Sequence, residues 1–430
     1  MTQQRETTRQ REMLKPFIGG EFVESAAERH MDVHDPSPGG VIAEAPCCTK
    51  PEVERAVAAA KGAWPAWRDT PPHKRAQLFF RLRELINRDF EELTMLVARE
   101  NGKAWLEAEG DVQKAREMTE LACGIPGMLM GESLMDASTG YDTTLYREPM
   151  GVFAGIAPWN FPAMIPMGWM SPLAIACGNT FVLKAASHTP MTSLRFAALY
   201  AEAGFPAGVL NVVTCSRGEA GLLLEHPDVK GVTFVGSTEA GARVYGAAAA
   251  AGKRAQALCE AKNHALVLDD APVTRTAAGI MNSAFGCAGE RCMALPVVVA
   301  QEGIADRLVA ELVRLCGLQK IGPAYDRATK LGPVVTAEHR ESVAAWIGAG
   351  AKEGAELVLD GRGAVVPGYE NGYYLGHTIF DRVEPGMSIG EREIFGPVLC
   401  VKRAKTFEEG LALMNGNPFA NGSVIYTQSG

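Results

Sequence analysis

The spacing of the hydrophobic positions changes about a third of the way along the 430-residue chain. In residues 50–101, apolar residues such as Val53, Val57 and Ala60 recur at intervals of three and four. This period predicts amphipathic helices that turn one face to the core. Upstream, two adjacent glycines between short apolar stretches predict a hairpin over Phe17–Val23.

Short apolar runs alternate with helical stretches after Tyr146. The predicted strands are Val152–Ala157, Thr180–Leu183, Val209–Val213 and Gly231–Val235, and the predicted helices are a stretch ending at Gly178, Leu194–Ala203, Gly218–Glu225 and Glu239–Ala251. Crossovers of this length join parallel strands, so the pattern predicts a doubly wound parallel sheet. Such a sheet binds its cofactor at the carboxyl ends of its strands.

A second alternating block begins near residue 265. It contains further predicted elements of both kinds, with strands at Val297–Ala300, near Leu357 and near Val398, and a helix at Ile304–Leu315. A chain of this length exceeds a single hydrophobic core. We therefore predict an α/β protein with a doubly wound, cofactor-binding domain at residues 1–258 and a second α/β domain at residues 259–430.

The composition restricts the partners of the protein. A net charge of −8 and a pI near 5.6 argue against a broad basic face, so we expect no nucleic-acid partner. The ten cysteines are scattered without a Cys-x-x-Cys pair, which predicts reduced thiols and no metal site. No run approaches the ~20 apolar residues of a membrane span, and the polar N-terminus holds no signal core. We therefore expect a cytoplasmic protein with no membrane partner.

No Gly-x-Gly-x-x-Gly fingerprint follows any predicted strand, but five other motifs occur in order. They are Pro158–Pro162 (PWNFP), Phe181–Lys184 (FVLK), Phe234–Gly241 (FVGSTEAG), Gly289–Cys292 (GERC) and Glu393–Pro397 (EIFGP). The ordered set spans most of the chain and resembles the aldehyde dehydrogenase superfamily. Within it, Ala261–His264 and Gly289–Ala294 look most like the methylmalonate-semialdehyde dehydrogenase branch, which transfers its acyl group to CoA.

The resemblance implies a reaction and its partners, and it makes residues 1–258 the NAD(P)-binding domain and residues 259–430 the catalytic domain. It implies an oxidoreductase that oxidises a small carboxylated aldehyde of the methylmalonate or malonate semialdehyde class, with NAD or NADP accepting the hydride and CoA accepting the acyl group. It also implies an oligomerisation or bridging hairpin near residues 123–145 and, if the family's C-terminal segment exists, a homo-oligomer that is either a dimer or a tetramer. Family members continue past the last residue of this chain with an oligomerisation segment, which we therefore expect to be absent.

Cys292 is the expected nucleophile. Only a thiolate attacks an aldehyde carbonyl well, and Cys292 follows a predicted helix, Thr274–Phe285, in a turn that contains glycine and arginine. We expect Arg291 to favour the thiolate and to attract an anionic substrate. Cys287 is either a small core residue or a neighbouring thiol with redox relevance.

The resemblance also assigns the groups around this cysteine. The side-chain amide of Asn160 and the backbone N–H of Cys292 are expected to stabilise the oxyanion. Gly236 and Ser237 open a helix whose N-terminus suits a pyrophosphate. The other residues expected at the cofactor are Lys184 and Gly208 at the adenosine ribose, Ser187 and His188 beside them, Glu393 at the nicotinamide ribose, Phe395 near the ring, and Trp159.

The first departure from the family pattern concerns deacylation. Most hydrolytic members carry a glutamate four residues before the lysine that Lys262 matches, and this glutamate activates water. Here the position is Leu258, so we expect water to attack the thioester slowly and a CoA thiol to do so instead. Glu260 stands where the nearest relatives have glycine; it either replaces the missing base or is only a charge at the edge of the pocket.

The second departure concerns the cofactor. NAD-preferring relatives have a glutamate at the position of Ser187, where a carboxylate bonds the ribose 2′-hydroxyl and repels a 2′-phosphate. Ser187 removes that repulsion, and Lys184 and His188 could attract the phosphate. Our hypothesis is that NADP is tolerated or even preferred.

The third departure concerns the substrate carboxylate, which the resembling branch holds with two arginines. Arg291 matches one of them, whereas Lys114 aligns with the other and Arg116 lies close by. Lysine keeps the charge but loses the bidentate fork of arginine. We expect these three residues to form the substrate-binding set.

Three interpretations of the function remain. The first is oxidation of a carboxylated aldehyde with CoA as acyl acceptor, and the second is a hydrolytic semialdehyde dehydrogenase that uses Glu260 or bulk water. The third is a non-catalytic, truncated relative with a nucleotide-binding or structural role. The presence of Cys292, Asn160, Lys184 and Glu393 favours the first two.

Overall fold

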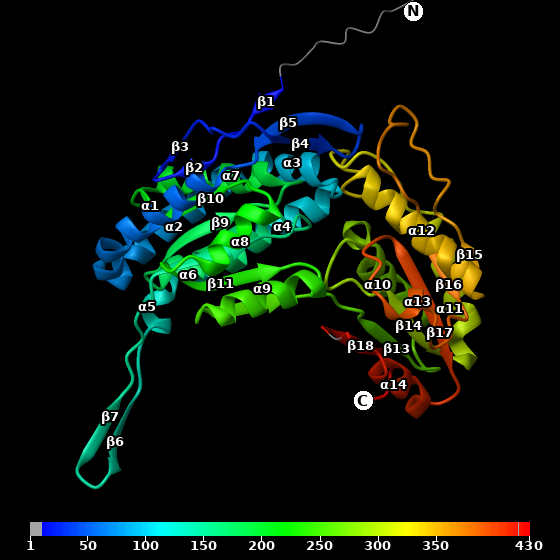
Figure 1. Ribbon diagram of the computed structural model, residues 1–430. Coiled ribbons are helices and arrows are strands. Elements are labelled where there is room, and N and C mark those ends of the chain that lie inside the picture. Colours follow the sequence, from blue (N-terminus) through cyan, green and yellow to red (C-terminus); the bar gives the residue numbers. More distant parts are fainter. Residues whose placement is uncertain (1–10, 420) are drawn as a thin grey trace, which may run out of the picture.

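The computed structural model describes residues 11–419 and 421–430. Figure 1 shows two lobes, one built by the blue-to-green part of the chain and the other by the yellow-green-to-red part. Each lobe is organised around its own β-sheet. A two-stranded hairpin projects from the first lobe, away from the second.

The sheet of the first lobe has seven strands in the order β12-β11-β8-β9-β10-β2-β3. They are β2 (Phe17–Ile18), β3 (Glu21–Phe22), β8 (Val152–Ile156), β9 (Thr180–Lys184), β10 (Leu210–Val213), β11 (Val229–Val235) and β12 (Arg254–Leu258). The strands from β12 to β10 are parallel, and the hairpin β2–β3 is added antiparallel at one edge. The predicted doubly wound parallel sheet is confirmed.

Helices cover both faces of this sheet. One face carries α1 (Lys50–Asp69), α8 (Arg217–Glu225) and α9 (Thr238–Ala250), and the other carries α2 (Pro72–Arg88), α3 (Phe90–Asn101), α4 (Trp105–Cys123), the π-helix η1 (Ile165–Met170), α6 (Ser171–Ala176) and α7 (Pro190–Ala203). Successive side chains of β9 alternate between the faces, with Phe181 and Leu183 packing on one side and Val182 on the other. All three are fully buried, and burying a side chain of this size stabilises the fold by about 1.5–3 kcal/mol.

Capping residues fix where two of these helices begin. The Glu52 carboxylate accepts the backbone N–H of Thr49 at 2.6 Å ahead of α1, and the Glu219 carboxylate accepts that of Ser216 at 3.1 Å ahead of α8. Both pairs are capping boxes, which satisfy N–H groups that a helix leaves free at its start. The second box places the start of α8 just past the carboxyl end of β10.

The sheet of the second lobe has six strands in the order β15-β16-β17-β14-β13-β18. They are β13 (His264–Val267), β14 (Val297–Gln301), β15 (Glu356–Leu359), β16 (Thr378–Asp381), β17 (Val398–Ala404) and β18 (Ser423–Tyr426). The helices around it are α10 (Val273–Phe285), α11 (Glu302–Cys316), α12 (Ala337–Glu353), α13 (Ser388–Glu391) and α14 (Phe407–Asn415). Only β15 runs antiparallel to its neighbour, so this lobe is also α/β.

Two smaller sheets complete the fold. β1 (Glu12–Met13), β4 (His30–Asp35) and β5 (Gly40–Pro46) form a three-stranded sheet, and β6 (Ser133–Ser138) and β7 (Tyr141–Thr144) form the projecting hairpin, which follows the short helix α5 (Ile125–Met128). The hairpin is exposed along its whole length. Within the described ranges, no helix has the length and apolar character needed to cross a membrane, and no group of acidic, histidine and cysteine side chains could hold a metal ion.

Candidate active site

Cys292 lies between α10 and β14 in a loop with an unusual backbone. A short 3-10 turn, Gly286–Gly289, follows α10. Within it Cys287, Ala288 and Gly289 have φ values of 54°, 53° and 73°. This left-handed region strains residues other than glycine, and such strain persists only where the surrounding structure imposes it.

A second strained loop touches the first. A Cβ on Gly289 would lie 2.0 Å from the carbonyl oxygen of Gly396, so only glycine permits this approach. Gly396 belongs to the loop Glu393–Pro397, in which Phe395 also has a positive φ of 61°. The fold therefore holds the loop of Cys292 against the loop that carries two of the expected cofactor residues.

The side chain of Cys292 is partly buried and its backbone is fixed. Its carbonyl oxygen accepts hydrogen bonds from the side-chain amides of Asn263 at 2.9 Å and Asn421 at 3.3 Å. A small cavity beside the residue is also lined by Arg291 and Glu393. These contacts leave the thiol as the chemically free part of the residue.

The environment makes this thiol less acidic. Burial raises the pKa of Cys292, and the negative charge of Glu393 raises it further, whereas Arg291 lowers it only slightly. The expected assistance from Arg291 therefore has the right sign, but burial outweighs it. The thiolate must form when a substrate or cofactor changes the site, or at alkaline pH.

This leads to a prediction about pH. In the free protein, alkylation of Cys292 by iodoacetamide is expected to accelerate about tenfold per pH unit from pH 7 to 9 without a plateau, because a raised pKa keeps the thiol protonated over this range. Peptide mass spectrometry against pH measures it. Glu393→Gln removes a charge that raises the pKa, so its curve should shift to lower pH. A plateau below pH 8 would contradict the prediction.

Asn160 lies against the loop of Cys292. The Asn160 side chain is buried, and its Nδ2 donates a hydrogen bond to the carbonyl oxygen of Glu290 at 3.1 Å. The preceding carbonyl, of Trp159, accepts a hydrogen bond from the Asn101 amide at 3.0 Å. One amide hydrogen of Asn160 is thus committed to the loop and the other is available to an oxyanion formed on Cys292.

Glu290 links this region to the cofactor side. Its buried carboxylate accepts the N–H of Val335 at 3.0 Å and lies 3.5 Å from Nε2 of His339. The same Nε2 is 2.7 Å from the carbonyl oxygen of Phe395. Burial raises the pKa of Glu290 well above its ordinary value. The Phe395 ring meets Trp159 edge-on at 5.4 Å, so the structure brings these two expected cofactor residues together.

The expected adenosine-side residues gather at the carboxyl end of β9. Nζ of Lys184 is 3.4 Å from Oγ of Ser187, and burial lowers the pKa of Lys184. His188 follows them and is exposed. A cation, a hydroxyl and an imidazole at a strand end form a suitable cradle for a phosphorylated ribose.

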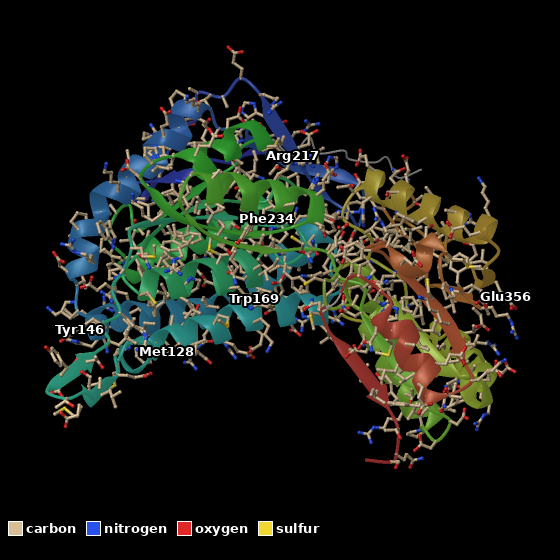
Figure 2. The ribbon with its side chains drawn as sticks, turned by 60° about the horizontal axis from the view of Figure 1, so that its bottom comes forward. Met128, Tyr146, Trp169, Arg217, Phe234 and Glu356 are labelled. Carbon is tan, nitrogen blue, oxygen red and sulfur yellow. The ribbon has the colours of Figure 1, made fainter. Side chains whose placement is uncertain are left out.

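The pyrophosphate side lies at the end of β11. Gly236 follows the strand, and a Cβ there would lie 2.6 Å from the ring of Phe234, which Figure 2 labels. Oγ of Ser237 caps α9 by accepting the N–H of Ala240 at 3.4 Å. These features fit a dinucleotide, because the helix N-terminus and the glycine turn suit its pyrophosphate.

Glu393 provides the expected contact on the nicotinamide side. Its Oε1 accepts the N–H of Ala261 at 3.2 Å. Burial raises its pKa to about 7. The carboxylate that would hold the ribose hydroxyls is thus placed beside the cavity of Cys292.

Leu258 and Glu260 lie at and just after the end of β12, near this region. Leu258 is the last residue of β12, which pairs with β11, and its side chain is 45% exposed. The Glu260 carboxylate accepts the N–H of Thr238, the first residue of α9, at 3.2 Å. Across the described part of the chain, no hydrogen bond joins Glu260 to Cys292. Its role as a replacement base stays a prediction, and this placement does not favour it.

Gly208 lies apart from the other residues expected at the adenosine ribose, so its contact with the cofactor stays a prediction that this placement does not favour. Gly208 precedes β10, which is parallel to β9 with Leu210 opposite Phe181, whereas Lys184 lies at the opposite, carboxyl end of these strands. A Cβ on Gly208 would lie 2.5 Å from the carbonyl oxygen of Ala59, so the glycine serves the packing of α1. A motif alone does not reveal whether a turn lies at the amino or the carboxyl end of the strands.

Arg217 lies at the carboxyl ends of the parallel strands, where Gly208 was expected. It is the first residue of α8, which follows the carboxyl end of β10, and it is labelled in Figure 2. Burial is the main cause of the lowered pKa of Lys184, and the charge of Arg217 lowers it further. This arginine was missed in the sequence analysis. The signal that could have found it is its position: it directly follows the serine that caps α8, and α8 follows a parallel strand.

The two substrate residues expected on α4 have other partners in this structure. Arg116 donates to the Asn87 side chain of α2 at 2.9 Å and lies over the ring of Phe90. These contacts direct it toward α2 and α3, so its contact with substrate stays a prediction that this placement does not favour. Lys114 is exposed and paired with Glu117 at 2.6 Å. Its contact with substrate stays a prediction.

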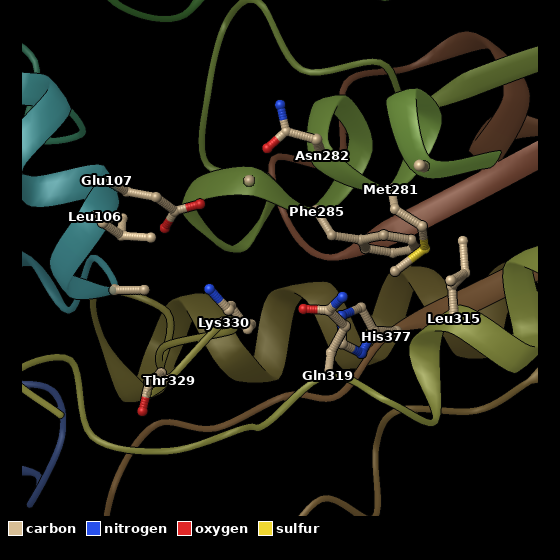
Figure 3. Close-up of a pocket in the computed structure, with 13 residues that line it drawn as sticks. Leu106, Glu107, Met281, Asn282, Phe285, Leu315, Gln319, Thr329, Lys330 and His377 are labelled. Atoms are coloured by element: carbon tan, nitrogen blue, oxygen red, sulfur yellow. The ribbon is translucent and has the colours of Figure 1, made fainter. Parts of the chain in front are cut away.

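The helix α4 presents other charged groups to the catalytic loop. Glu107 accepts the backbone N–H of Cys287 at 2.5 Å, and burial raises the pKa of Glu107 to about 7. Lys103, just before α4, forms a buried ion pair with Asp111 at 2.8 Å. Figure 3 shows Glu107 extending from α4 into a cavity of about 330 Å³ that also borders α10. Burial raises the pKa of the Cys287 thiol, which disfavours a redox role.

Comparison with known proteins agrees with this geometry. The model of the aldehyde dehydrogenase family matches residues 22–430. Malonate-semialdehyde dehydrogenase 2 of Geobacillus kaustophilus (strain HTA426) is 49% identical over 418 residues, which are 97% of this chain and 86% of that protein. Malonate-semialdehyde dehydrogenase of Bacillus pumilus (strain SAFR-032) is 44% identical with the same coverage.

Solved structures agree as well. A proposed methylmalonate-semialdehyde dehydrogenase from Sinorhizobium meliloti 1021, complexed with NAD, is 41% identical and has a TM-score of 0.96 over 98% of this chain and 86% of that one. The methylmalonate-semialdehyde dehydrogenase of Oceanimonas doudoroffii has a TM-score of 0.95 at 41% identity, over 97% of this chain and 86% of that one. The fold, the ordered motifs around Cys292 and these likenesses place the chain in the aldehyde dehydrogenase family.

Proposed function

We propose that this protein oxidises a carboxylated aldehyde of the malonate or methylmalonate semialdehyde class to an acyl-CoA, with NAD or NADP as hydride acceptor. The observation that carries the CoA step is Leu258. An alkyl side chain stands where hydrolytic family members have their water-activating carboxylate, and it cannot take a proton. The thioester on Cys292 then survives until a better nucleophile than water arrives.

The residues of this chain divide the reaction as follows. The Cys292 thiolate attacks the aldehyde carbon, and the new oxyanion accepts hydrogen bonds from the Asn160 amide and the Cys292 N–H. The bound dinucleotide supplies the acceptor for the hydride, and the carbonyl re-forms as a thioester. The CoA thiolate attacks that thioester and expels the Cys292 thiolate, which closes the cycle. One aldehyde, one oxidised dinucleotide and one CoA give one acyl-CoA, one reduced dinucleotide and one proton.

The class of aldehyde is supported by relatives and by charge. Proteins named malonate-semialdehyde dehydrogenase are 44 to 49% identical to this chain. Arg291 lines the same cavity as Cys292, and its Nη2 donates to the carbonyl of Ser283 at 3.2 Å while its buried Nε has no partner among the described residues. An unsatisfied guanidinium N–H beside the thiol suits a substrate carboxylate.

The function is tested by following reduced nicotinamide with malonate or methylmalonate semialdehyde, with and without CoA. We expect a burst of one equivalent per active chain without CoA and sustained turnover with it. Sustained turnover without CoA would support the hydrolytic alternative. No burst with any aldehyde of a panel would leave the non-catalytic alternative.

The same assay with both dinucleotides tests the proposed use of NADP. The adenosine end of the site carries two positive charges and a hydroxyl, from Lys184, Arg217 and Ser187. None of these three side chains would repel a 2′-phosphate. A 2′-phosphate should therefore be accepted. A kcat/KM at least as high with NADP as with NAD is the expected result, and a strong preference for NAD would contradict it.

We also propose that the hairpin β6–β7 joins copies of this chain into a homo-oligomer. Large apolar side chains are exposed on and beside it, among them Tyr141 at 71% and Tyr146 at 79%. Figure 2 shows Tyr146 and Met128 at the end of the lobe from which the hairpin projects. Exposed apolar side chains gathered on a projecting element are typical of a protein interface. A single-chain mass in sedimentation velocity would contradict this.

The proposed location is the cytoplasm. All ten cysteines are free thiols, and six of them are buried. Free thiols in this number persist in a reducing compartment. Localisation of a tagged chain in its own host would test the proposal.

A further inference from the structure

Glu260 occupies part of the surface that the proposed function assigns to the dinucleotide. The first turn of α9 has free N–H groups that point out of the helix, as every helix start does. In this structure two of them already have side-chain partners. The Ser237 hydroxyl accepts the N–H of Ala240, and the Glu260 carboxylate accepts the N–H of Thr238 at 3.2 Å.

The carboxylate reaches α9 from a different part of the chain. Glu260 lies 22 residues after Thr238, in the segment that links β12 to β13. Its backbone is anchored, because the N–H of the next residue, Ala261, is bonded to Glu393. The anchored backbone keeps the Glu260 charge near α9 and near Glu393, whose pKa it helps to raise.

A carboxylate and a pyrophosphate cannot share this position. Both are anions, and both are attracted to the positive end of the helix dipole and to the same N–H groups. A dinucleotide that binds at α9 must displace Glu260 from Thr238 and then remain near its negative charge. The competition costs binding energy for every dinucleotide, oxidised or reduced.

We propose that Glu260 is an affinity-setting residue that occupies the pyrophosphate position of the empty site and shortens the residence time of the bound dinucleotide. This inference rests on the proposed function, because it takes α9 as the pyrophosphate site. Its consequence for that function is kinetic. A dinucleotide that leaves quickly after hydride transfer clears the site for the acyl acceptor, whose thiol must reach Cys292.

The test compares two substitutions that remove the same charge. Glu260→Gln removes the competing carboxylate, whereas Glu239→Gln removes a charge from the same first turn of α9, where Glu239 is exposed and paired with Arg243. The dissociation constants for NAD⁺ and NADPH are measured by fluorescence titration, and the dissociation rate of NADPH by stopped flow. The Cys292 burst, measured with each preparation, shows that the variants are folded and active.

We expect Glu260→Gln to tighten both dinucleotides about three- to tenfold and to slow NADPH release by a similar factor. Glu239→Gln should change them less than twofold. Unchanged or weaker binding in Glu260→Gln would overturn the inference, and so would an equal tightening in both variants. If the wild type binds dinucleotide and gives a burst, but Glu260→Gln leaves dinucleotide affinity and release unchanged, only the inference is refuted. A wild type that does neither refutes the proposed function with it.

Discussion

Replacing Cys292 by serine is expected to abolish the burst of reduced nicotinamide, with a loss of at least about a thousandfold. Serine preserves the size of the side chain and the hydrogen bonds that the Cys292 carbonyl accepts from Asn263 and Asn421. Its hydroxyl is far less acidic than a thiol, so it stays protonated and attacks the aldehyde poorly. Dinucleotide binding should persist, because the substitution leaves the residues assigned to the dinucleotide, at the ends of β9 and β11, at the start of α9 and in the loop Glu393–Pro397, unchanged.

The matched control for this experiment is Cys287→Ser. Cys287 is the nearest cysteine in sequence, but its thiol is buried in the core of the first lobe and its backbone N–H is held by Glu107. Its replacement should keep the burst amplitude, provided that circular dichroism shows a folded protein. A Cys292→Ser variant that retains more than a few per cent of the burst would show that another group is the nucleophile.

The second large effect is a gain of activity. Leu258→Glu is expected to add CoA-independent turnover and raise the rate of thioester hydrolysis about a hundredfold or more, which is the usual contribution of a positioned general base. The half-exposed Leu258 side chain at the end of β12 can be replaced without opening a core cavity. Steady-state production of reduced nicotinamide without CoA measures the change.

The control variant Leu258→Gln distinguishes the effect of a base from that of a polar side chain of the same length. Glutamine cannot take a proton, so this variant should remain dependent on CoA like the wild type. Equal hydrolysis by both variants would mean that the leucine only excludes water from the thioester. A Leu258→Glu variant without any hydrolysis would move the deacylation step away from this position.

The parallel core of the fold was predictable, because its strands are buried on both faces. The run Val152–Ala157 is apolar throughout, Val209–Val213 is apolar except for the buried Asn211, and the helices between them have a clear period. The edge strand β12 was missed. Its residues alternate between exposed and partly exposed, with Arg254 and Gln256 pointing outward, and no apolar run marks it. The domain division at residue 258 stays a prediction.

The site was predictable only as far as short motifs extend. Cys292 and Asn160 could be named from the residues around them, but the hydrogen bond of Asn160 to Glu290 spans 130 residues. The directions of Arg116 and Glu260 depend on which helix each side chain meets in three dimensions. Glu107 has no motif of its own, and its partner Cys287 lies 180 residues away. Such pairings are made by tertiary packing, which the local pattern does not encode.

The contact between Gly289 and Gly396 limits how this enzyme can be rebuilt. Because a single added carbon at Gly289 would collide with the carbonyl of Gly396, the loop of the nucleophile and the loop of the ribose-binding glutamate form one unit. Transplanting either loop alone into a relative would change the distance between the acyl group on the cysteine and the hydride acceptor. Exchanging the two together carries the distance between thiol and cofactor with them, so substrate range could be altered around an unchanged reaction centre.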